Sequence, residues 1–262
     1  MEINNFDRQS AAAGIVYGRK KVALYVSALL MIHFGLITSG IAQENLSKEI
    51  RWVRQSVEYA AVCKQTYFAA WRAVKSMAPA QQGDWAVVLD IDETVLDNSQ
   101  YQVELFERGE SFSYATWNRW VERKESAAVP GVKAFLDSVR AIGPHAHVAF
   151  ITNRDAKLDP ATEGNLKALG LWGDGDVLMG RRERADTKEV RRQEVITGTG
   201  RCEGLGTRTI IALIGDQVGD FFEPADGVSY EELKTQVLEH PDFGVRFFAL
   251  PNPMYGDWER GY

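Results

Sequence analysis

Three short apolar runs, each followed directly by polar residues, dominate the pattern of hydrophobic and polar positions along the chain. The runs are Ala86–Leu89, His147–Ile151 and Thr209–Ile214. Apolar runs of this length are typical of buried strands. Helical patterns over 132–141 and 186–195 lie between them. Because strands and helices alternate along the chain, the sequence predicts an α/β fold with a doubly wound parallel sheet.

Further helices are predicted before the first strand and directly after it. Residues 44–77 contain few chain-breaking residues and predict a long helix or a helix pair, with a linker at 78–83. We expect an aromatic-rich helical insertion and the amino-terminal helices to form a small helical cap over the candidate site described next. The expected organisation is a signal peptide or membrane anchor over 1–42, a helical segment over 43–83, a core domain over 84–97 and 131–262, and the cap insertion over 98–130.

Two carboxylates follow the first apolar run. Asp90 and Asp92 are two residues apart, so in a continuing strand they point to the same face. Two like charges this close are costly unless a cation or a shared proton relieves them, and a divalent metal ion is the expected partner. Such a pair suits one aspartate to attack phosphorus and the other to act as general acid and base. The alternative is a surface turn with solvated acids.

Polar residues also follow the second and third runs. Thr152–Arg154 supplies a hydroxyl, an amide and a guanidinium, which suit phosphate oxygens. Asp216 and Asp220 follow the third run, and Gly215 allows a tight turn before them. Since the carboxyl ends of parallel strands form the ligand-binding edge of open α/β sheets, the three strand ends predict one site.

Lys188 lies in the first turn of the predicted helix over 186–195, for which Asp186 or Thr187 is the expected N-cap. A lysine at this position opposes the helix dipole, so an anion is expected beside it. Taken alone, Lys188 is more typical of a solvated helix residue. Between the second and third strands, however, it completes a phosphate- or metal-binding pattern.

In this order, the residues resemble the four motifs of the haloacid dehalogenase (HAD) superfamily: Asp90-x-Asp92-x-Thr94, Thr152, Lys188 and Gly215-Asp216-x-x-x-Asp220. Longer stretches resemble the bacterial class-B-like, nonspecific acid phosphatases of HAD subfamily IIIB, a group that includes outer-membrane lipoprotein acid phosphatases and 5′-nucleotidases. These stretches are Leu89–Ser99, Trp117–Val121, Thr152–Arg154 and Leu250–Glu259. The resemblance extends over residues 45 to 260.

The resemblance implies a HAD-type sheet with a cap and an enzyme that hydrolyses phosphomonoesters. Asp90 would be the nucleophile that forms an aspartyl-phosphate, and Asp92 the general acid and base. Thr152 and Lys188 would hold the transferring phosphoryl group. The anion that the position of Lys188 requires would then be the substrate phosphate.

A magnesium ion is implied at the same place. A carboxylate oxygen of Asp90, the backbone carbonyl of Asp92 and the carboxylate of Asp216 would bind it, with Asp220 near or behind the waters of the metal. This ligand set suits Mg²⁺, which prefers a few oxygens and keeps several waters.

Aromatic residues of the insertion allow two interpretations. Core packing is expected for Phe106, Phe112 and Trp120 because aromatic residues at helical spacing are usually buried. The resemblance instead places Trp117 at the substrate pocket with Tyr255 from the tail. Such a pair would stack on an aryl group or a nucleobase, which predicts aryl phosphates and nucleoside 5′-monophosphates as substrates. The polar residues after the second apolar run also predict substrate contacts by Asn153 and Arg154.

Other activities of the superfamily fit less well. The sequence Asp92–Thr94 matches neither the dehalogenases, which lack the second acid, nor the ion pumps, which carry Lys-Thr-Gly-Thr after the nucleophile. A phosphotransferase that passes phosphate to a second alcohol remains an alternative because an aspartyl-phosphate can react with acceptors other than water. An inactive binding or storage relative is a further alternative, although all the motif residues are present.

Composition agrees with one compact enzyme. The chain has 262 residues, of which 45% are hydrophobic and 25% charged, enough for one sizeable core. A net charge of −6 and the lack of a long basic cluster disfavour a nucleic-acid polymer as partner. The expected partner is a small-molecule phosphomonoester, and the sequence does not indicate an oligomeric state.

The amino terminus has the pattern of an export signal. Arg19–Lys21 precedes the apolar segment Val22–Ile41, and small residues at Gly40 and Ala42 precede a cleavage point at Gln43. We therefore expect a periplasmic or secreted protein, with an uncleaved anchor facing the periplasm as the alternative. No cysteine lies at the cleavage point, so a lipid anchor is not expected.

The cysteine pattern leaves two possibilities. Cys63 and Cys202 could pair in an oxidising compartment or remain buried thiols, and the sequence slightly favours unpaired thiols.

Overall fold

The computed structural model describes residues 46–225 and 227–260. The chain divides into the units Met1–Ser47 and Lys48–Tyr262, and all the elements below belong to the second. The predicted signal peptide or anchor lies outside the described residues. Among the residues that are described, no helix combines the length and apolar character needed to cross a membrane.

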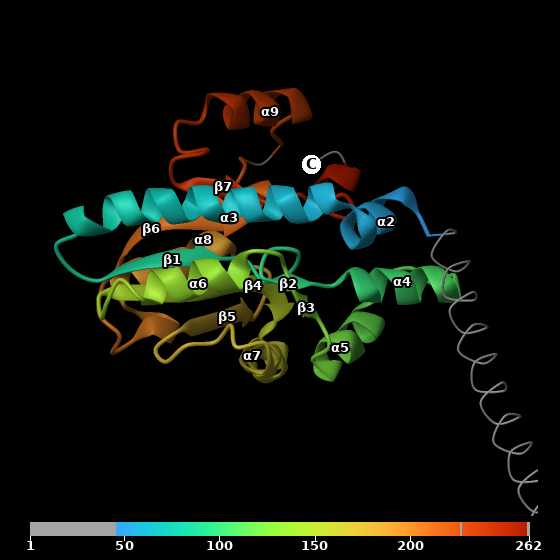
Figure 1. The fold of residues 1–262 in the computed structure, drawn as a ribbon, viewed down its shortest axis with the longest axis horizontal. Helices are drawn as coiled ribbons and strands as arrows, with labels where there is room; N and C mark the ends of the chain where they lie inside the picture. Colours follow the sequence, from blue (N-terminus) through green and yellow to red (C-terminus); the bar gives the residue numbers. More distant parts are fainter. Residues whose placement is uncertain (1–45, 226, 261–262) are drawn as a thin grey trace, which may run out of the picture. The chain divides into compact units, whose positions relative to one another are not determined.

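A five-stranded parallel sheet with the order β5-β4-β1-β6-β7 forms the centre of this unit (Figure 1). Its strands are β1 (Trp85–Leu89), β4 (Ala146–Asp155), β5 (Val177–Arg181), β6 (Thr209–Gly215) and β7 (Phe247–Ala249). A separate antiparallel pair consists of β2 (Leu96–Asp97) and β3 (Ala127–Ala128). The helices are α2 (Lys48–Gln55), α3 (Val57–Met77), α4 (Ser99–Arg108), α5 (Tyr114–Arg123), α6 (Val132–Arg140), α7 (Asp159–Ala168), α8 (Lys188–Thr197) and α9 (Tyr230–Glu239).

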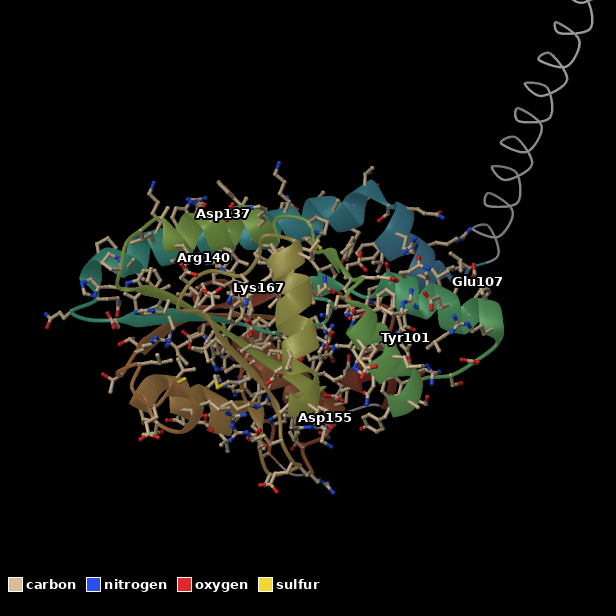
Figure 2. The ribbon with its side chains drawn as sticks, turned by 90° about the horizontal axis from the view of Figure 1, so that it is seen from below. Tyr101, Glu107, Asp137, Arg140, Asp155 and Lys167 are labelled. Carbon is tan, nitrogen blue, oxygen red and sulfur yellow. The ribbon has the colours of Figure 1, made fainter. Side chains whose placement is uncertain are left out.

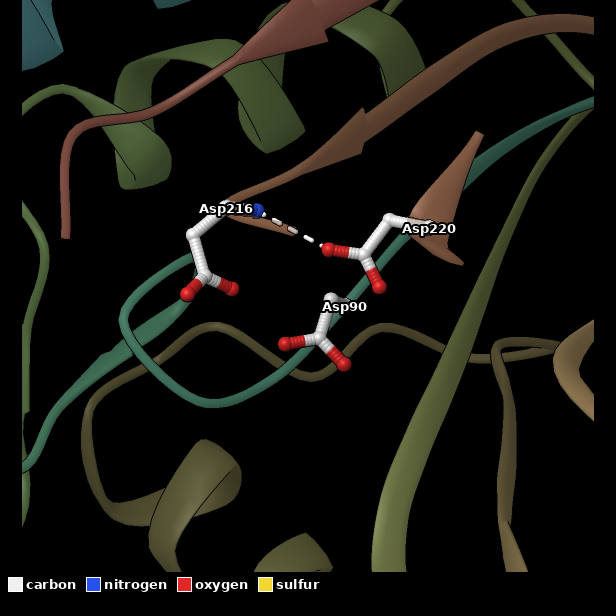
Figure 3. Close-up of side chains that lie close together, drawn as sticks. All are labelled: Asp90, Asp216 and Asp220. Carbon is white, nitrogen blue, oxygen red and sulfur yellow. Dashed lines mark hydrogen bonds between the residues drawn. The ribbon is translucent and has the colours of Figure 1, made fainter. Parts of the chain in front are cut away.

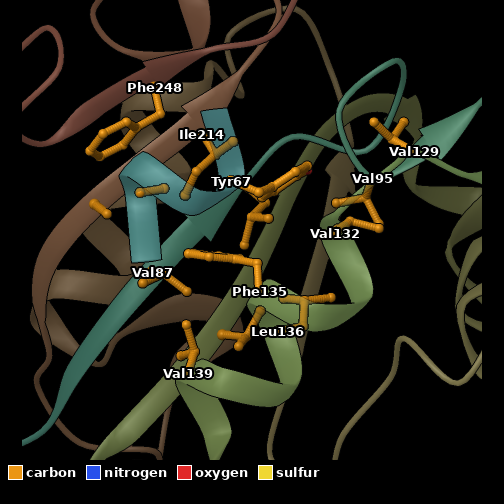
Figure 4. Packing of buried hydrophobic residues seen from close by; sticks show 14 of the residues in the cluster. Tyr67, Val87, Val95, Val129, Val132, Phe135, Leu136, Val139, Ile214 and Phe248 are labelled. Atoms are coloured by element: carbon orange, nitrogen blue, oxygen red, sulfur yellow. The ribbon is translucent and has the colours of Figure 1, made fainter. Parts of the chain in front are cut away.

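Strand β1 is buried on both faces, as its apolar run predicts. Val87 and Leu89 belong to one core cluster together with residues of α3 and α6 (Figure 4). Ala86 and Val88 alternate with them and belong to a second cluster that includes Val195 of α8. Helices therefore cover both faces of the parallel sheet, and the predicted doubly wound α/β fold is confirmed.

The strand order brings distant parts of the chain to one edge. Leu89 at the end of β1 pairs with Phe150 of β4 on one side and with Ile214 of β6 on the other. From β1 the chain adds β4 and β5 on one side of the sheet and then β6 and β7 on the other. Open α/β sheets bind ligands at such a point, beyond the carboxyl ends of the strands. The predicted polar segments after the three apolar runs consequently meet at this edge.

The amino-terminal helices take different positions from the expected cap. Residues 44–77 form a helix pair, α2 and α3, as one of the two interpretations allowed. Helix α3 carries a buried stripe at helical spacing, from Tyr59 through Tyr67 to Val74, and packs on α6 and the sheet. Helix α2, in contrast, contacts α4 of the insertion. The expectation that both helices belong to the cap is therefore wrong for α3, because its apolar face is needed to cover the sheet.

Helices α4 and α5 form a small lobe beside the end of the sheet, with Tyr101 and Glu107 of α4 well apart from Asp137 and Arg140 of α6 (Figure 2). The lobe packs through a hydrophobic cluster of Tyr101, Leu105, Trp120, Val121 and, from the segment after β4, Leu158. The domain boundaries at 98 and 130 remain a proposal.

Two of the three predicted core aromatics of the insertion are exposed. Trp120 is 1% exposed, as predicted. Phe106 is 45% exposed and Phe112 is 56% exposed, so the prediction is wrong for both. Phe106 follows the buried Leu105 and is therefore about 100° around the helix from it. Phe112 lies in the connection between α4 and α5, outside either helical stripe.

Both cysteines are buried and unpaired, the interpretation that the sequence slightly favoured. Cys63 lies in the core cluster on the α3 side of the sheet and Cys202 in the cluster on the α8 side. The sheet therefore separates the two thiols.

Candidate active site

Three carboxylates meet beyond the ends of β1 and β6. Asp90 follows β1, whereas Asp216 and Asp220 follow β6, and one oxygen from each lies within 4.8 Å of the others. Figure 3 shows the three side chains directed toward a common space. Asp90 and Asp220 are buried. Like charges at this spacing require compensation by a cation or a proton.

Lys188 supplies part of that compensation. Its ammonium group donates hydrogen bonds to Asp90 Oδ1 and Asp220 Oδ1. The sequence positions it locally: Thr187 is the N-cap of α8, its Oγ1 accepting from Val190 N at 3.3 Å, so Lys188 is the first helical residue. The anion expected beside Lys188 is thus provided by these two aspartates.

Electrostatics around the three acids favour a divalent cation. Burial opposes the charge on Lys188, but Asp220 and Asp90 outweigh it and raise the pKa of the ammonium above its ordinary value. Burial also raises the pKa of Asp90, against the effect of Lys188, and burial with the neighbouring Asp220 raises the pKa of Asp216 to about 7. Three ionised carboxylates and one ammonium leave two negative charges, which a divalent ion would balance. The donors are all hard oxygens, so this set fits Mg²⁺ chemically.

Asp216 is held by side chains from two other places. Its Oδ2 accepts from Gln217 Nε2 at 2.7 Å and from Asn252 Nδ2 at 2.9 Å, and Thr94 Oγ1 lies 3.4 Å from Oδ1. Asn252 lies in the carboxyl-terminal tail, which follows β7. The tail therefore fixes one of the three carboxylates.

The turn after β6 depends on glycine for steric reasons. Asp220 Oδ2 accepts from the backbone nitrogens of Asp216 at 2.9 Å and Gln217 at 2.8 Å, which folds the carboxylate back over the strand end. A Cβ atom on Gly215 would lie 2.2 Å from Asp220 Cβ. The missing side chain of Gly215 thus leaves room for the side chain of Asp220.

Asp92 has a separate set of partners. Its Oδ1 accepts from Arg154 Nη2 at 2.6 Å, from Arg154 Nε at 2.9 Å and from Asn98 Nδ2 at 2.9 Å. The hydroxyl of Thr152 lies 3.4 Å from Asp92 Oδ2. Strand β1 ends at Leu89, so strand alternation does not extend through the two acids. The carboxylate of Asp92 is accordingly not one of the three oxygens around the candidate metal position.

Arg154 is placed inside the protein and not on an open surface. Besides Asp92, its guanidinium donates to Thr162 Oγ1 at 3.1 Å, and it lies over the ring of Trp117 at 5.4 Å. Its side chain is 1% exposed. The structure therefore gives Arg154 a carboxylate partner where the sequence suggested substrate phosphate.

The carboxyl-terminal part of β4 is fixed by a residue that sequence reasoning did not single out. Arg191 is fully buried and donates to the carbonyl oxygens of Thr152 and Met179. It also donates to Asn153 Oδ1 at 2.8 Å. The available signal was its spacing, because Arg191 lies three residues after Lys188 on the same face of α8.

The two predicted stacking aromatics are half-buried. The ring of Trp117 lies edge-on to Tyr101 at 5.1 Å and near Phe112 at 6.3 Å. The hydroxyl of Tyr255 is buried without a hydrogen-bond partner. Within the described residues, no ring contact joins Tyr255 to Trp117, so the sandwich they were expected to form stays a prediction.

Several residues that shape the site lie within stretches already notable in the sequence but had no assigned role there. They are Thr94, Asn98, Gln217 and Asn252. Asn98 and Asn252 could have been noticed in the sequence as amides beside acidic or turn-forming residues. Their partners could not be identified from the sequence, because they come from other parts of the chain.

Comparisons with known proteins agree with this geometry. The model of the family described as HAD superfamily, subfamily IIIB (acid phosphatase) matches residues 23–258. The structure of the class C acid phosphatase from Bacillus anthracis matches at 30% sequence identity with a TM-score of 0.69, covering 81% of this chain and 86% of that chain. The structure of the same enzyme with tungstate bound matches at 30% identity with a TM-score of 0.68 and the same coverage. The chain belongs to subfamily IIIB of the HAD superfamily and is an acid phosphatase.

Proposed function

We propose that this acid phosphatase hydrolyses phosphomonoesters through an aspartyl-phosphate on Asp90, with Mg²⁺ as its metal ion. The observation that carries the proposal is the meeting of Asp90, Asp216 and Asp220 with Lys188 at the strand ends. These groups combine an oxygen nucleophile with compensating positive charge.

In the proposed first step, Asp90 attacks phosphorus in line with the leaving oxygen. Lys188 already contacts Asp90 and is positively charged, so it is suited to neutralise charge on the phosphoryl oxygens. The Thr152 hydroxyl would donate to the same oxygens. Asp90, Asp216 and the backbone carbonyl of Asp92 would hold Mg²⁺, which supplies further positive charge at the phosphoryl group.

Asp92 would transfer the protons. It would protonate the leaving alcohol and then deprotonate the water that cleaves the aspartyl-phosphate. Arg154 and Asn98 bind the carboxylate of Asp92, whereas Lys188 binds that of Asp90. These different partners support distinct roles for the two acids. Asp220 would act behind the metal position by orienting Lys188 and the turn that carries Asp216.

For substrates, we propose aryl phosphates and nucleoside 5′-monophosphates. Trp117 lies on α5, beside the guanidinium that holds Asp92, so an aromatic leaving group at this ring would be near the proposed acid. Tyr255 lies three residues after Asn252, which binds Asp216. The proposed recognition is stacking by the two rings, with Asn153 beside the phosphate.

The function is tested by a panel of aryl, nucleoside and alkyl phosphates assayed after EDTA treatment and again after Mg²⁺ is added back. We expect EDTA to abolish turnover and Mg²⁺ to restore it. Because protons compete with the cation for Asp216, whose pKa is about 7, the apparent Mg²⁺ affinity should rise between pH 5 and pH 8. Full activity in EDTA would refute the metal assignment. Added glycerol in the same assay detects transfer to a second alcohol.

The nucleophile is tested by Asp90→Asn. We expect loss of more than about a thousandfold in kcat, since the amide cannot attack phosphorus. Asp137→Asn on α6, which removes an exposed ion pair with Lys133, is the matched control and should retain full activity. Residual activity above a few per cent in the Asp90 variant, with deamidation excluded by mass spectrometry, would contradict the covalent mechanism.

Substrate choice is tested by Trp117→Ala and Tyr255→Ala. Each should lower kcat/KM for an aryl or nucleoside phosphate, relative to an alkyl phosphate, by roughly tenfold, the equivalent of about 1.4 kcal/mol of stacking. Phe68→Ala on α3 removes a ring that is 60% exposed and should leave the ratio unchanged. If neither site variant changes the ratio, the proposal of aromatic substrates fails.

We also propose that the protein is exported and that its mature form begins near Gln43. This proposal rests on the basic, apolar and small residues before that position. N-terminal sequencing of the native protein tests it. A chain that begins at Met1 and sediments with membranes would indicate the anchor instead.

A further inference from the structure

Asn98 connects the proposed proton donor to the cap lobe. It is fully buried between β2 and α4. Its Nδ2 donates to Asp92 Oδ1 at 2.9 Å, to Glu93 Oε2 at 3.2 Å and to the Leu96 carbonyl at 3.3 Å. One side of the amide therefore faces only acceptors, among them the carboxylate of Asp92.

The other side of the same amide faces donors. Asn98 Oδ1 accepts from Trp120 Nε1 at 2.9 Å, from Ser126 Oγ at 2.8 Å and from Arg154 Nη2 at 3.4 Å. An indole and a guanidinium can only donate, and a backbone carbonyl can only accept. The amide therefore has one orientation that satisfies all its neighbours, and a flip would place like groups against each other.

Glu93 fixes the base of this arrangement. Its carboxylate accepts from the Asn98 backbone nitrogen at 2.8 Å as well as from Nδ2. Glu93 is buried and has a positive φ of 56°, a conformation that is unfavourable for a residue with a side chain. This backbone strain at a buried acid indicates that the surrounding contacts hold the turn between Asp92 and Asn98 in place.

The donors to Asn98 belong to the cap or contact it. Trp120 is in α5, and Ser126 lies just before β3 at the base of the insertion. Arg154 contacts Trp117, three residues before Trp120 on α5. The lobe that would contact the substrate is thus joined to the proposed acid by a continuous set of buried hydrogen bonds.

We propose that Asn98 is a positioning residue that fixes the carboxylate of Asp92 against the cap, so that proton transfer to the leaving oxygen depends on the Asn98 amide. The inference rests on the proposed role of Asp92. Asn98 itself acts only through Asp92 and the cap. A small displacement of a proton donor reduces its efficiency steeply, and this dependence makes the proposal measurable.

The test compares kcat/KM for an alkyl phosphate with kcat/KM for p-nitrophenyl phosphate. Only the alkyl leaving group requires protonation, and kcat/KM covers the steps up to formation of the aspartyl-phosphate. We expect Asn98→Ala to lower the alkyl-to-aryl ratio by about tenfold or more. Asn98→Ser provides a second, smaller replacement, and the denaturation midpoint of each variant establishes that it is folded.

Asn165→Ala is the matched structural control. Asn165 of α7 is also a buried asparagine, and it bonds the backbone nitrogen and oxygen of Ser126 at the base of the cap. Within the described residues it makes no hydrogen bond to Asp92. It should reduce stability and lower both activities together, leaving the ratio unchanged. Equal ratios in the folded Asn98 and Asn165 variants would overturn the proposal, since Asn98 would then be structural only.

Asp92→Asn separates the inference from the function on which it rests. This variant should lower the same ratio, and Asn98→Ala added to it should lower the ratio no further. If Asp92→Asn leaves the ratio unchanged, the assignment of Asp92 as acid fails. If Asp92→Asn changes the ratio but the Asn98 variants do not, the acid stands and the positioning role of Asn98 is refuted.

Discussion

The crowding of buried and half-buried carboxylates at one edge of the sheet is the constraint on which the rest of the site depends. Asp90, Asp92, Glu93, Asp216 and Asp220 all lie just beyond strand ends, in surroundings that remove much of their solvent. Charge in such surroundings must be paired or neutralised. The neighbouring helices, the tail and the cap each supply part of the hydrogen bonding or positive charge that makes this crowding stable.

Two cations divide these acids into separate groups. Lys188 at the start of α8 binds Asp90 and Asp220, whereas Arg154 at the end of β4 binds Asp92. The first group retains excess negative charge and therefore fits a metal ion. In the second, the carboxylate of Asp92 is bound by a guanidinium and an amide. One strand end can thus present two aspartates, two residues apart, in different electrostatic surroundings, as the two proposed roles require.

Local pattern was sufficient to predict the parts of the structure that depend on local sequence. The apolar runs predicted β1, β4 and β6, and the polar residues after them predicted which edge of the sheet carries the chemistry. Capping preferences placed Lys188 at the start of α8. The contacts of Arg154 and the tail's hold on Asp216 were not predictable in this way, because they join segments 62 and 36 residues apart. The exposed Phe106 and Phe112 show the same limit, since composition and spacing reveal neither which face a short helix covers nor where it ends.

The hydrogen bond from Asn252 in the carboxyl-terminal tail to Asp216 also affects when the site can form during protein synthesis. Asp90 leaves the ribosome well before Asn252, which fixes Asp216 and lies 162 residues later in the chain. Because chains fold progressively from the amino terminus, a nascent chain has most of its sheet before its third carboxylate is anchored. Full assembly of the catalytic edge therefore requires that Asn252 has been synthesised, so a product truncated before this residue would contain the sheet but lack the amide that holds Asp216.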